Sequence, residues 1–313
     1  MLRYVTDEEA RGLISLDEGI ELMHELFRQE AAGETENHST VELALGKGFF
    51  RLKAGAAYGM GCYGFKAYGN GRYTVFLYGT ESGHLEGIVE CHGLTEVRTA
   101  AVSALGAKLM ARADAQALGI IGTGREARAQ LPGMLKVRPI TSVKAYSRSA
   151  GHRERFAAEM SDRYGVPVTA VDSGEECVRD ADLVVTITGA NEPVLLGRWL
   201  RPGTHVCAIG ATTPQRRELD EEAIARAGTI VVEHLEGAKA ELGELQFAAA
   251  RGKLRWGRVR ELKDVAAGLM PGRTSDDEIT IIDTIGVGSE DVAIAWAALS
   301  KARANGVGQE LPL

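Results

Sequence analysis

The stretch Gly119–Ala127, near the middle of the chain, constrains the fold more than any other. It joins a short apolar run to a Gly-x-Gly-x-x-Ala turn, and an Ala/Arg-rich segment of helical composition follows. The first glycine permits a sharp turn, the second lets backbone approach a ligand, and the alanine allows close helix packing. Because free N–H groups at a helix start bind phosphate, the stretch predicts a dinucleotide-binding turn. The residues expected against the cofactor are Gly122, Thr123, Gly124, Arg125, Glu126 and Ala127.

A second stretch, Gly59–Gly64, matches the Gly-x-Gly-x-x-Gly pattern even more closely. No buried type of strand precedes it, and residues 65–71 after it show no helical period. We therefore expect no phosphate-binding turn there.

Length and charge limit the class of protein. At 313 residues, the chain is long enough for two domains or one large α/β unit. Its formal charge of -7 comes from acidic and basic residues mixed along the chain, so a nucleic-acid partner is not expected. No apolar run is long enough to cross a bilayer, so no membrane partner is expected either.

The spacing of cysteine and histidine residues does not predict a metal site. The 7 histidines form no ligand pattern, and the 4 cysteines lie far apart. Since no signal peptide indicates an oxidising compartment, we expect reduced thiols in a cytoplasmic protein. The cysteines are Cys62, Cys91, Cys177 and Cys207.

The first part of the chain predicts helices around a mostly antiparallel sheet. Capping boxes at Thr6–Glu9 and Ser15–Glu18 predict two helix starts. Strands are expected at residues 49–53, 63–68, 73–78 and 85–90, and the turn-rich residues 79–84 predict a hairpin between the last two. A helix of small residues is expected from Leu94 to Ala111.

Beyond Asp114, strand and helix candidates alternate. Apolar runs at residues 117–121, 142–146, 168–170, 183–188, 205–209 and 229–232 are mostly separated by segments of helical length. This predicts parallel βαβ units in a doubly wound sheet. Pro132-Gly133 interrupts the first helix, which we expect to be short or bent. A further helix is expected from Ser289 onward.

The end of the second predicted strand bears on the choice of cofactor. A site that prefers NAD places a carboxylate there, whereas this chain has Ser147-Arg148-Ser149 and no carboxylate before Glu154. Because a guanidinium flanked by hydroxyls suits a 2′-phosphate, the sequence favours NADP(H), with NAD(H) as the alternative. In that alternative, Arg148 is a solvated surface charge.

Several phrases together resemble the ornithine cyclodeaminase/mu-crystallin family. They occur in the order typical of the family, and the most specific part is Arg-Thr-Ala-Ala followed by the dinucleotide turn. The phrases are Gly64-Phe65-Lys66, Arg98-Thr99-Ala100-Ala101-Val102-Ser103, Gly122-Thr123-Gly124, Asn191-Glu192-Pro193, Ile209-Gly210-Ala211, Arg217-Glu218-Leu219-Asp220, Thr284-Ile285-Gly286 and Glu290-Asp291.

The resemblance implies a homodimer and an α/β fold with two domains. A Rossmann domain, expected at residues 114–288, pairs with an α+β dimerisation and substrate domain formed by residues 1–113 and 289–313. In such proteins a nicotinamide cofactor exchanges hydride with a small amino or imino acid. The family includes cyclodeaminases, alanine dehydrogenases, ketimine reductases and a hormone-binding crystallin.

The resemblance also assigns two cationic residues to the active site. Lys66 matches the family's active-site lysine, and Arg98 matches the arginine that binds the substrate carboxylate. Both types suit these roles, because a guanidinium holds a carboxylate in one orientation and an ammonium group can act as an acid. The alternatives are a strand-edge lysine and a charge on a helix surface.

Four further positions of the match are expected to touch the cofactor: Thr188, Gly189, Thr284 and Gly286. As bare residues, Thr188 and Gly189 equally fit a strand end and its turn. Asp291 fits a helix N-terminal charge as well as a site residue.

Two departures from the family pattern affect the substrate. Cyclodeaminases and alanine dehydrogenases carry an acidic residue shortly after the fifth Rossmann strand, where this chain has Thr212, as in ketimine reductases; a hydroxyl there is not a carboxylate base. The family's second carboxylate-binding arginine appears here as His38, a weaker partner. Arg51 or Lys53 is a candidate to replace it.

The resulting first hypothesis is an NAD(P)H-dependent reductase of a C=N bond next to a carboxylate. Its substrate would be a cyclic ketimine or an α-imino acid, and its product an amino acid. The alternatives are an ornithine cyclodeaminase and a non-catalytic protein that binds NADPH and a small acid.

Overall fold

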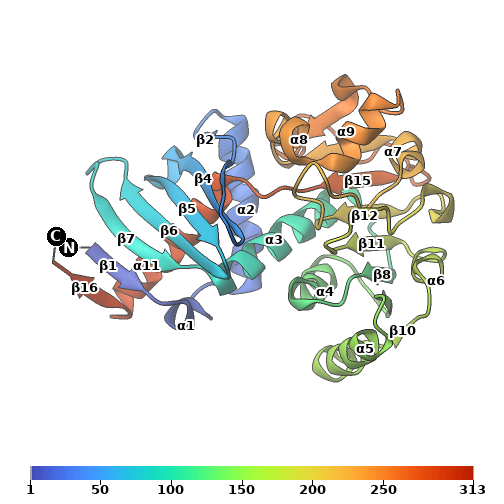
Figure 1. The fold of residues 1–313 in the computed structure, drawn as a ribbon, viewed down its shortest axis with the longest axis horizontal. Helices are drawn as coiled ribbons and strands as arrows, with labels where there is room; N and C mark the ends of the chain where they lie inside the picture. Colours follow the sequence, from blue (N-terminus) through green and yellow to red (C-terminus); the bar gives the residue numbers. More distant parts are fainter. Residues whose placement is uncertain (1, 313) are drawn as a thin grey trace. The chain divides into compact units, whose positions relative to one another are not determined.

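The chain divides into two units, which are described separately (Figure 1). In the computed structural model, which describes residues 2–312, unit 1 comprises Met1–Val102 with Gly286–Leu313, and unit 2 comprises Ser103–Ile285. The division falls inside helix α3 (His92–Met110) and again after Ile285. The functional domain boundaries expected from the sequence, after residues 113 and 288, lie eleven and three residues further along the chain and remain a prediction.

Unit 1 is built on an eight-stranded sheet, ordered β16-β1-β7-β6-β5-β4-β2, in which β3 also pairs with β4. The pairs β4–β5, β5–β6 and β6–β7 are antiparallel, which confirms the predicted sheet and its hairpin. Strands β1, β2, β3 and β16 were not predicted, because each is only three or four residues long. The bounds are β1 Leu2–Val5, β2 Thr35–Asn37, β3 Val41–Ala44, β4 Phe49–Ala57, β5 Cys62–Gly69, β6 Arg72–Gly79, β7 Leu85–Glu90 and β16 Gln309–Leu311.

Helices of unit 1 begin where the sequence predicts. Both capping boxes form, so α1 (Asp7–Ala10) starts after Thr6 and α2 (Leu16–Ala31) starts after Ser15. Met23, Leu26 and Phe27 of the apolar stripe of α2 are fully buried.

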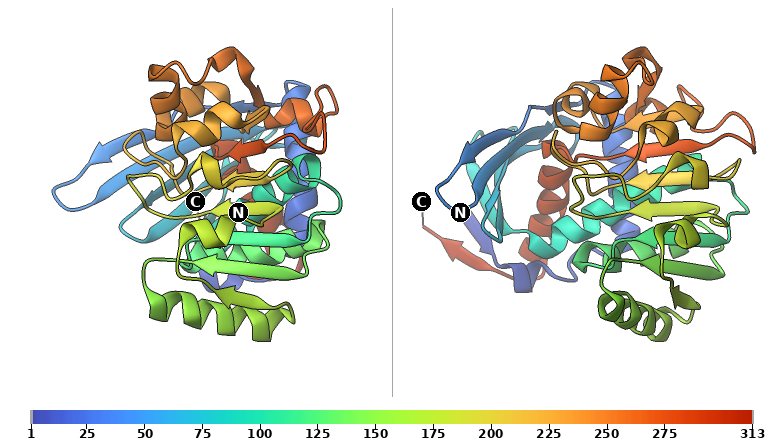
Figure 2. Two further views of the ribbon diagram at one scale, coloured as in Figure 1. Left: turned by 90° about the vertical axis from the view of Figure 1, so that its right-hand side faces the viewer. Right: turned by 45° about the vertical axis from the view of Figure 1, so that its right-hand side comes forward.

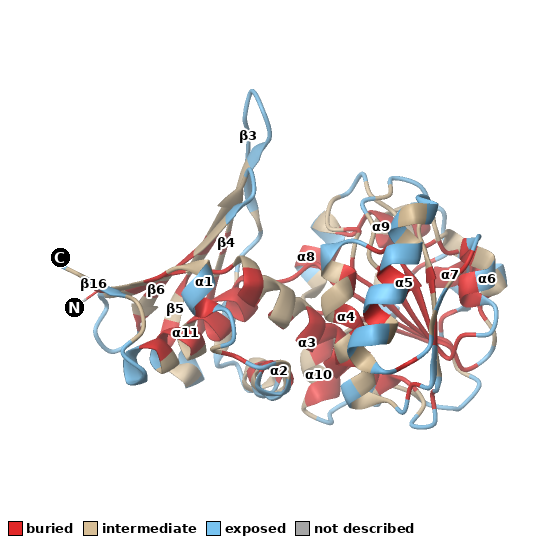
Figure 3. Ribbon diagram, turned by 90° about the horizontal axis from the view of Figure 1, so that it is seen from below, coloured by how far each residue is buried: buried red, intermediate tan, exposed pale blue. Residues whose placement is uncertain are grey.

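Helix α11 (Gly288–Ala304) packs on β4 and β5 and is largely buried (Figure 3). Its first turn lies almost on the backbone of β4. A Cβ on Gly55 would stand 2.2 Å from the Ser289 nitrogen, and a Cβ on Gly288 would stand 2.2 Å from the Ala54 oxygen. Two glycines therefore permit an approach that brings the start of α11 onto the sheet.

Unit 2 is a parallel sheet, ordered β10-β9-β8-β11-β12-β15-β13-β14 (Figure 2). The chain runs outward from β8 to β10 and then continues from β11 on the other side of β8, which confirms the doubly wound fold. All six predicted strands are present, and β14 and β15 were not predicted. The bounds are β8 Ala117–Ile121, β9 Ser142–Tyr146, β10 Val168–Ala170, β11 Leu183–Thr186, β12 His205–Ala208, β13 Thr229–Val232, β14 Val259–Glu261 and β15 Thr280–Asp283.

The helices of unit 2 connect these strands. Their bounds are α4 Arg125–Val137, α5 Ala150–Tyr164, α6 Gly174–Val178, α7 Glu221–Arg226, α8 Leu235–Glu241, α9 Gly243–Ala250 and α10 Leu262–Ala266. Helix α4 is not cut short at Pro132, because the buried residues Leu131 and Met134 on either side hold it in the core.

Two further findings concern thiols and membranes. All four cysteines are free thiols, as predicted, and the structure buries them all; burial raises the pKa of the Cys177 thiol to about 12. Within residues 2–312, no helix combines the length and apolarity needed to cross a membrane.

Candidate functional site

The glycine-rich turn of unit 2 has the geometry that a dinucleotide requires. Gly122 has a φ of 111°, and a Cβ there would lie 2.3 Å from the Ile187 oxygen, so only glycine fits. Gly124 caps the N-terminus of α4, and a Cβ on it would meet nothing within 4 Å. Ala127 is fully buried, which allows α4 to lie close to the sheet. Open space in front of free helix N–H groups fits a pyrophosphate.

Neighbouring side chains hold this turn in place. Thr123 Oγ1 donates to Ser147 Oγ at 2.8 Å, which links the turn to the end of β9. Arg128 Nη1 donates to the carbonyl oxygens of Thr123 at 3.1 Å and of Gly124 at 3.0 Å. Arg128 was not among the predicted site residues, although an arginine one helical turn after the N-cap is a visible signal for such a bond.

Arg125 and Glu126 form an ion pair with each other at 3.1 Å, on the first turn of α4. Both side chains are partly exposed. The structure therefore leaves them beside the turn as a mutually neutralised pair.

The residues after β9 are the ones that the sequence connects with a 2′-phosphate. Arg148 is exposed and makes no hydrogen bond or ion pair with any residue from 2 to 312. Ser149 is the N-cap of α5, with no side-chain capping bond, so helix N–H groups and a guanidinium are adjacent in the chain.

Three further predicted cofactor residues, Thr188, Gly189 and Thr284, and the predicted catalytic residue Thr212 follow β11, β12 and β15. The carboxyl ends of these strands share one edge with that of β8. The Thr188 N–H donates to Glu218 Oε1 at 2.5 Å, and Gly189 is exposed. Thr212 is half-buried, and its N–H donates to the Gly210 oxygen at 3.2 Å. Thr284 is buried, with its hydroxyl 3.5 Å from the Ala208 oxygen.

Lys66 lies inside the sheet of unit 1, so the alternative of a strand-edge lysine is wrong. Strand β5 is paired on both sides, and the lysine is only 2% exposed. Its Nζ donates to Thr95 Oγ1 at 2.9 Å and to Asp291 Oδ1 at 3.0 Å. It also lies over the rings of Tyr68 and Tyr73, at 5.2 and 5.0 Å from their centroids.

Arg98 is buried as well, so the alternative of a helix-surface charge is wrong. Its Nε donates to Asp291 Oδ1 and its Nη1 to Glu290 Oε2, both at 3.1 Å. Gly286 has a φ of 67°, and a Cβ on it would lie 2.5 Å from Arg98 Nη1. Glycine is therefore needed where backbone passes the guanidinium.

Asp291 joins the two cations, because one of its oxygens accepts from both. It lies in the first turn of α11 and is 2% exposed. Burial opposes ionisation, but the charges of Arg98 and Lys66 prevail and hold its pKa below the ordinary value. Asp291 is thus both an N-terminal helix charge and a member of this cluster.

Lys53 is a third buried cation in unit 1. It is the cross-strand partner of Lys66, and its Nζ donates to the Gly286 oxygen at 2.6 Å. The cluster of Lys53, Lys66 and Arg98 with Glu290 and Asp291 thus carries three formal positive charges and two negative ones. A net positive charge in a buried place favours a bound carboxylate.

The two other predicted substrate residues are engaged elsewhere. His38 has a side chain that is 64% exposed and pairs with Glu36 at 2.9 Å. Arg51 pairs with Glu42 at 2.5 Å and lies over the Phe49 ring. Of the candidates to replace the family's second arginine, Lys53 is therefore the one that is buried beside Lys66.

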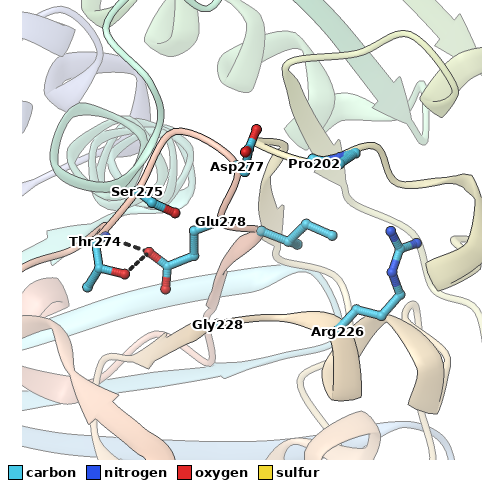
Figure 4. Close-up of a pocket in the computed structure, with 8 residues that line it drawn as sticks. Pro202, Arg226, Gly228, Thr274, Ser275, Asp277 and Glu278 are labelled. Carbon is cyan, nitrogen blue, oxygen red and sulfur yellow. Dashed lines mark hydrogen bonds between the residues drawn. The ribbon is translucent and has the colours of Figure 1, made fainter.

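A pocket of about 450 Å³ lies at the opposite edge of the sheet of unit 2, at the amino ends of β13 and β15 (Figure 4). Glu278 in its wall accepts hydrogen bonds from the N–H and hydroxyl of Thr274. Because ligands of open α/β sheets bind at the carboxyl ends of strands, this pocket is not part of the candidate site.

Comparison with known proteins places the chain among nicotinamide-dependent enzymes. The iminosuccinate reductase of Paracoccus denitrificans is 31% identical over 99% of each chain. The structure of Thermococcus litoralis Δ1-pyrroline-2-carboxylate reductase with NADH and L-proline has a TM-score of 0.95, with 28% identity over 99% of this chain and 100% of that one. An archaeal alanine dehydrogenase dimer with bound NAD has a TM-score of 0.94, with 33% identity over 100% of this chain and 99% of that one. The model of the ornithine cyclodeaminase/mu-crystallin family matches residues 3–306, and the chain belongs to that family.

Proposed function

We propose that this protein is an NAD(P)H-dependent oxidoreductase that reduces a C=N bond next to a carboxylate. Its substrate is a cyclic ketimine or an α-imino acid, and its product is the amino acid. The relatives named as iminosuccinate and pyrroline-2-carboxylate reductases support this reaction type. The chain's own support is the buried cluster in which Lys66 and Arg98 share Asp291.

The cluster explains how the substrate acid is held. Arg98 and Lys53 supply positive charge for the carboxylate, in a place where burial strengthens the attraction. Glu290 and Asp291 fix the guanidinium through two of its nitrogen atoms, which limits its orientation. Positioning of this kind lowers the entropic cost of reaching the transition state.

Lys66 is the proposed acid. Thr95 and Asp291 accept two of the three ammonium hydrogens, and no residue from 2 to 312 accepts the third. That hydrogen is available to the imine nitrogen, which must gain a proton as its carbon gains hydride. The nicotinamide supplies the hydride when it is bound. Thr212 carries no carboxylate, so it does not act as the base that a deaminating cyclisation needs.

The cofactor is proposed to bind along the carboxyl edge of the sheet in unit 2. The turn Gly122–Ala127 would hold the pyrophosphate, and residues 147–149 would hold the adenosine end. We favour NADP(H), because the exposed Arg148 and the start of α5 suit a 2′-phosphate. Thr188, Gly189, Thr284 and Gly286 are proposed neighbours of the nicotinamide half.

We further propose that unit 1 forms a homodimer through one face of its sheet. Residues of β5 alternate, so that Lys66 faces α11 while Phe65 faces away. On that outer face Phe65 stacks on Phe76, with centroids 4.9 Å apart, and Tyr63 stacks on Tyr78 at 5.3 Å. These aromatic rings are half-buried and suit a second copy of the chain. The functional division then follows the predicted domains, with residues 1–113 and 289–313 for substrate and dimer and 114–288 for the cofactor.

Four free thiols fit a reducing compartment, and we propose the cytoplasm.

The reaction is tested by mixing the purified protein with NADPH or NADH and a panel of cyclic and acyclic imino acids. Oxidation of the reduced cofactor, with the matching amino acid as product, is the expected result. Ammonia release from ornithine without net cofactor change would identify a cyclodeaminase instead. Bound cofactor with a flat absorbance trace for every imine would identify a binding protein.

A further inference from the structure

Glu218 is a fully buried carboxylate whose two oxygens bind both loops that follow β11 and β12. Oε1 accepts the Thr188 N–H at 2.5 Å. Oε2 accepts the Gly210 N–H at 2.7 Å and the Thr186 hydroxyl at 2.9 Å. Burial raises the pKa of Glu218, and these hydrogen bonds oppose that effect. A buried charge is costly, so three donors at one carboxylate indicate a specific arrangement.

The two loops are in direct contact where the carboxylate joins them. A Cβ on Gly210 would lie 2.2 Å from the Thr188 oxygen and 2.7 Å from Glu218 Oε1. The backbone spacing at this point is therefore set by a glycine and a glutamate together. Both loops lie at the carboxyl ends of strands next to the switch point between β8 and β11, where open α/β sheets bind their ligands.

We propose that Glu218 is a positioning residue for the dinucleotide. Its carboxylate holds the loops after β11 and β12 at the spacing that the nicotinamide half of the cofactor requires. This inference rests on the proposed cofactor site of unit 2. In this proposal the shape of the cofactor site depends on the Glu218 carboxylate, which holds the loops but does not touch the cofactor.

A neighbouring carboxylate provides a matched control. Glu244 is buried to the same degree and accepts the Glu218 N–H at 2.7 Å, but neither loop donates a hydrogen bond to it within residues 2–312. Glu244→Gln keeps an oxygen for that N–H and leaves the bonds of Glu218 in place. The effect of replacing a buried carboxyl group is therefore separated from the effect of losing the link between the loops.

The experiment titrates NADH and NADPH into wild type, Glu218→Gln and Glu244→Gln by cofactor fluorescence, without any imine. The amide of Glu218→Gln turns an N–H₂ group toward backbone or hydroxyl donors, so at least one bond to a loop is lost. We expect the Kd for the reduced cofactor to rise about tenfold or more in this variant, and to change less than about twofold in Glu244→Gln. In turnover, the KM for cofactor should rise more than kcat falls.

Each outcome has a separate meaning. Failure of wild type to bind either cofactor would overturn the proposed function itself. Normal wild-type binding with an unchanged Kd in Glu218→Gln would overturn only the role of Glu218. If Glu218→Gln does not fold, Thr186→Val removes one donor with little change of shape. That variant should still raise the Kd severalfold, and an unchanged Kd would count against the inference.

Discussion

Lys66 Nζ and Asp291 Oδ1 lie 3.0 Å apart, although 225 residues separate them in the sequence. The same oxygen accepts from Arg98 Nε, so one carboxylate holds two cations side by side. Without that negative charge the cations would repel each other in a medium of low dielectric. The start of α11 is therefore part of the substrate site that we propose for unit 1.

Asp291→Asn should destabilise the protein strongly. The substitution keeps the shape but removes the charge that both cations share, and breaking a buried ion pair costs about 3–5 kcal/mol. The measurement is the free energy of unfolding from urea titration. The control is Glu175→Gln, which breaks an exposed pair with Arg179 and should cost less than about 1 kcal/mol. Equal effects of the two variants would contradict the role given to Asp291.

Lys66→Ala should abolish imine reduction and leave cofactor binding nearly intact. Lys66 belongs to unit 1, whereas the phosphate-binding turn belongs to unit 2. Turnover and the Kd for NADPH are measured on the same preparation, with the exposed Lys239→Ala as the control. Wild-type turnover in the Lys66 variant would remove this residue from the mechanism.

Arg148→Ala should weaken the binding of NADPH and leave the binding of NADH nearly unchanged. If the guanidinium binds a 2′-phosphate, its loss costs a charge-assisted bond, so KM for NADPH should rise about tenfold or more. The KM for NADH should stay within about twofold, since NADH has no such phosphate. Arg179→Ala, at an exposed helix end, serves as the control. Parallel changes for both cofactors would instead favour a surface role for Arg148.

Phe76→Glu should convert a dimer to monomers. The side chain stacks on Phe65 on the outer face of the sheet, and a charge buried there between two copies would have no partner. Sedimentation or light scattering measures the mass at several concentrations. Tyr58→Glu changes an aromatic residue that is 49% exposed and should leave the mass unaltered. A wild-type protein that is already a monomer would refute the proposed interface.

The free energy of unfolding should fall as the pH rises from about 4.5 to about 8, because acidic groups buried in unit 2 lose their protons in this range. Burial, and then the charge of Glu218, raise the pKa of Glu244 from 4.5 to about 8. Burial, and then Glu244, also raise the pKa of Asp283 well above its usual value. In this pH range the carboxyl groups of the unfolded chain are already ionised, whereas those of the folded protein still hold their protons. Raising the pH therefore removes stabilisation that is present at low pH.

Urea titrations at several pH values measure this dependence. In Glu244→Gln the slope of unfolding free energy against pH should become shallower, because one titrating group is gone. A slope identical to that of wild type would show that Glu244 and Asp283 do not retain a proton in the folded protein over this pH range.

The features that the sequence alone determined are local ones. The turn at Gly122–Ala127, the two capping boxes and the alternating strands of unit 2 each depend on residues within a few positions of one another. The continuation of α4 through Pro132 was not predicted, because it depends on core contacts with residues distant in the sequence. The family resemblance also rests on short sequence motifs, and the family model over residues 3–306 confirms it.

Tertiary structure decided which charged residues meet. From the sequence alone, Asp291 fits an ordinary charge at a helix N-terminus. Lys53 and Arg51 are equal candidates to bind the carboxylate of the substrate. Close packing at Gly55 and Gly288 brings α11 onto β4, and strand register sets Lys53 opposite Lys66 while Arg51 pairs with Glu42. Charge interactions depend on distance and burial in space, and neither quantity is encoded in the spacing of residues along a chain.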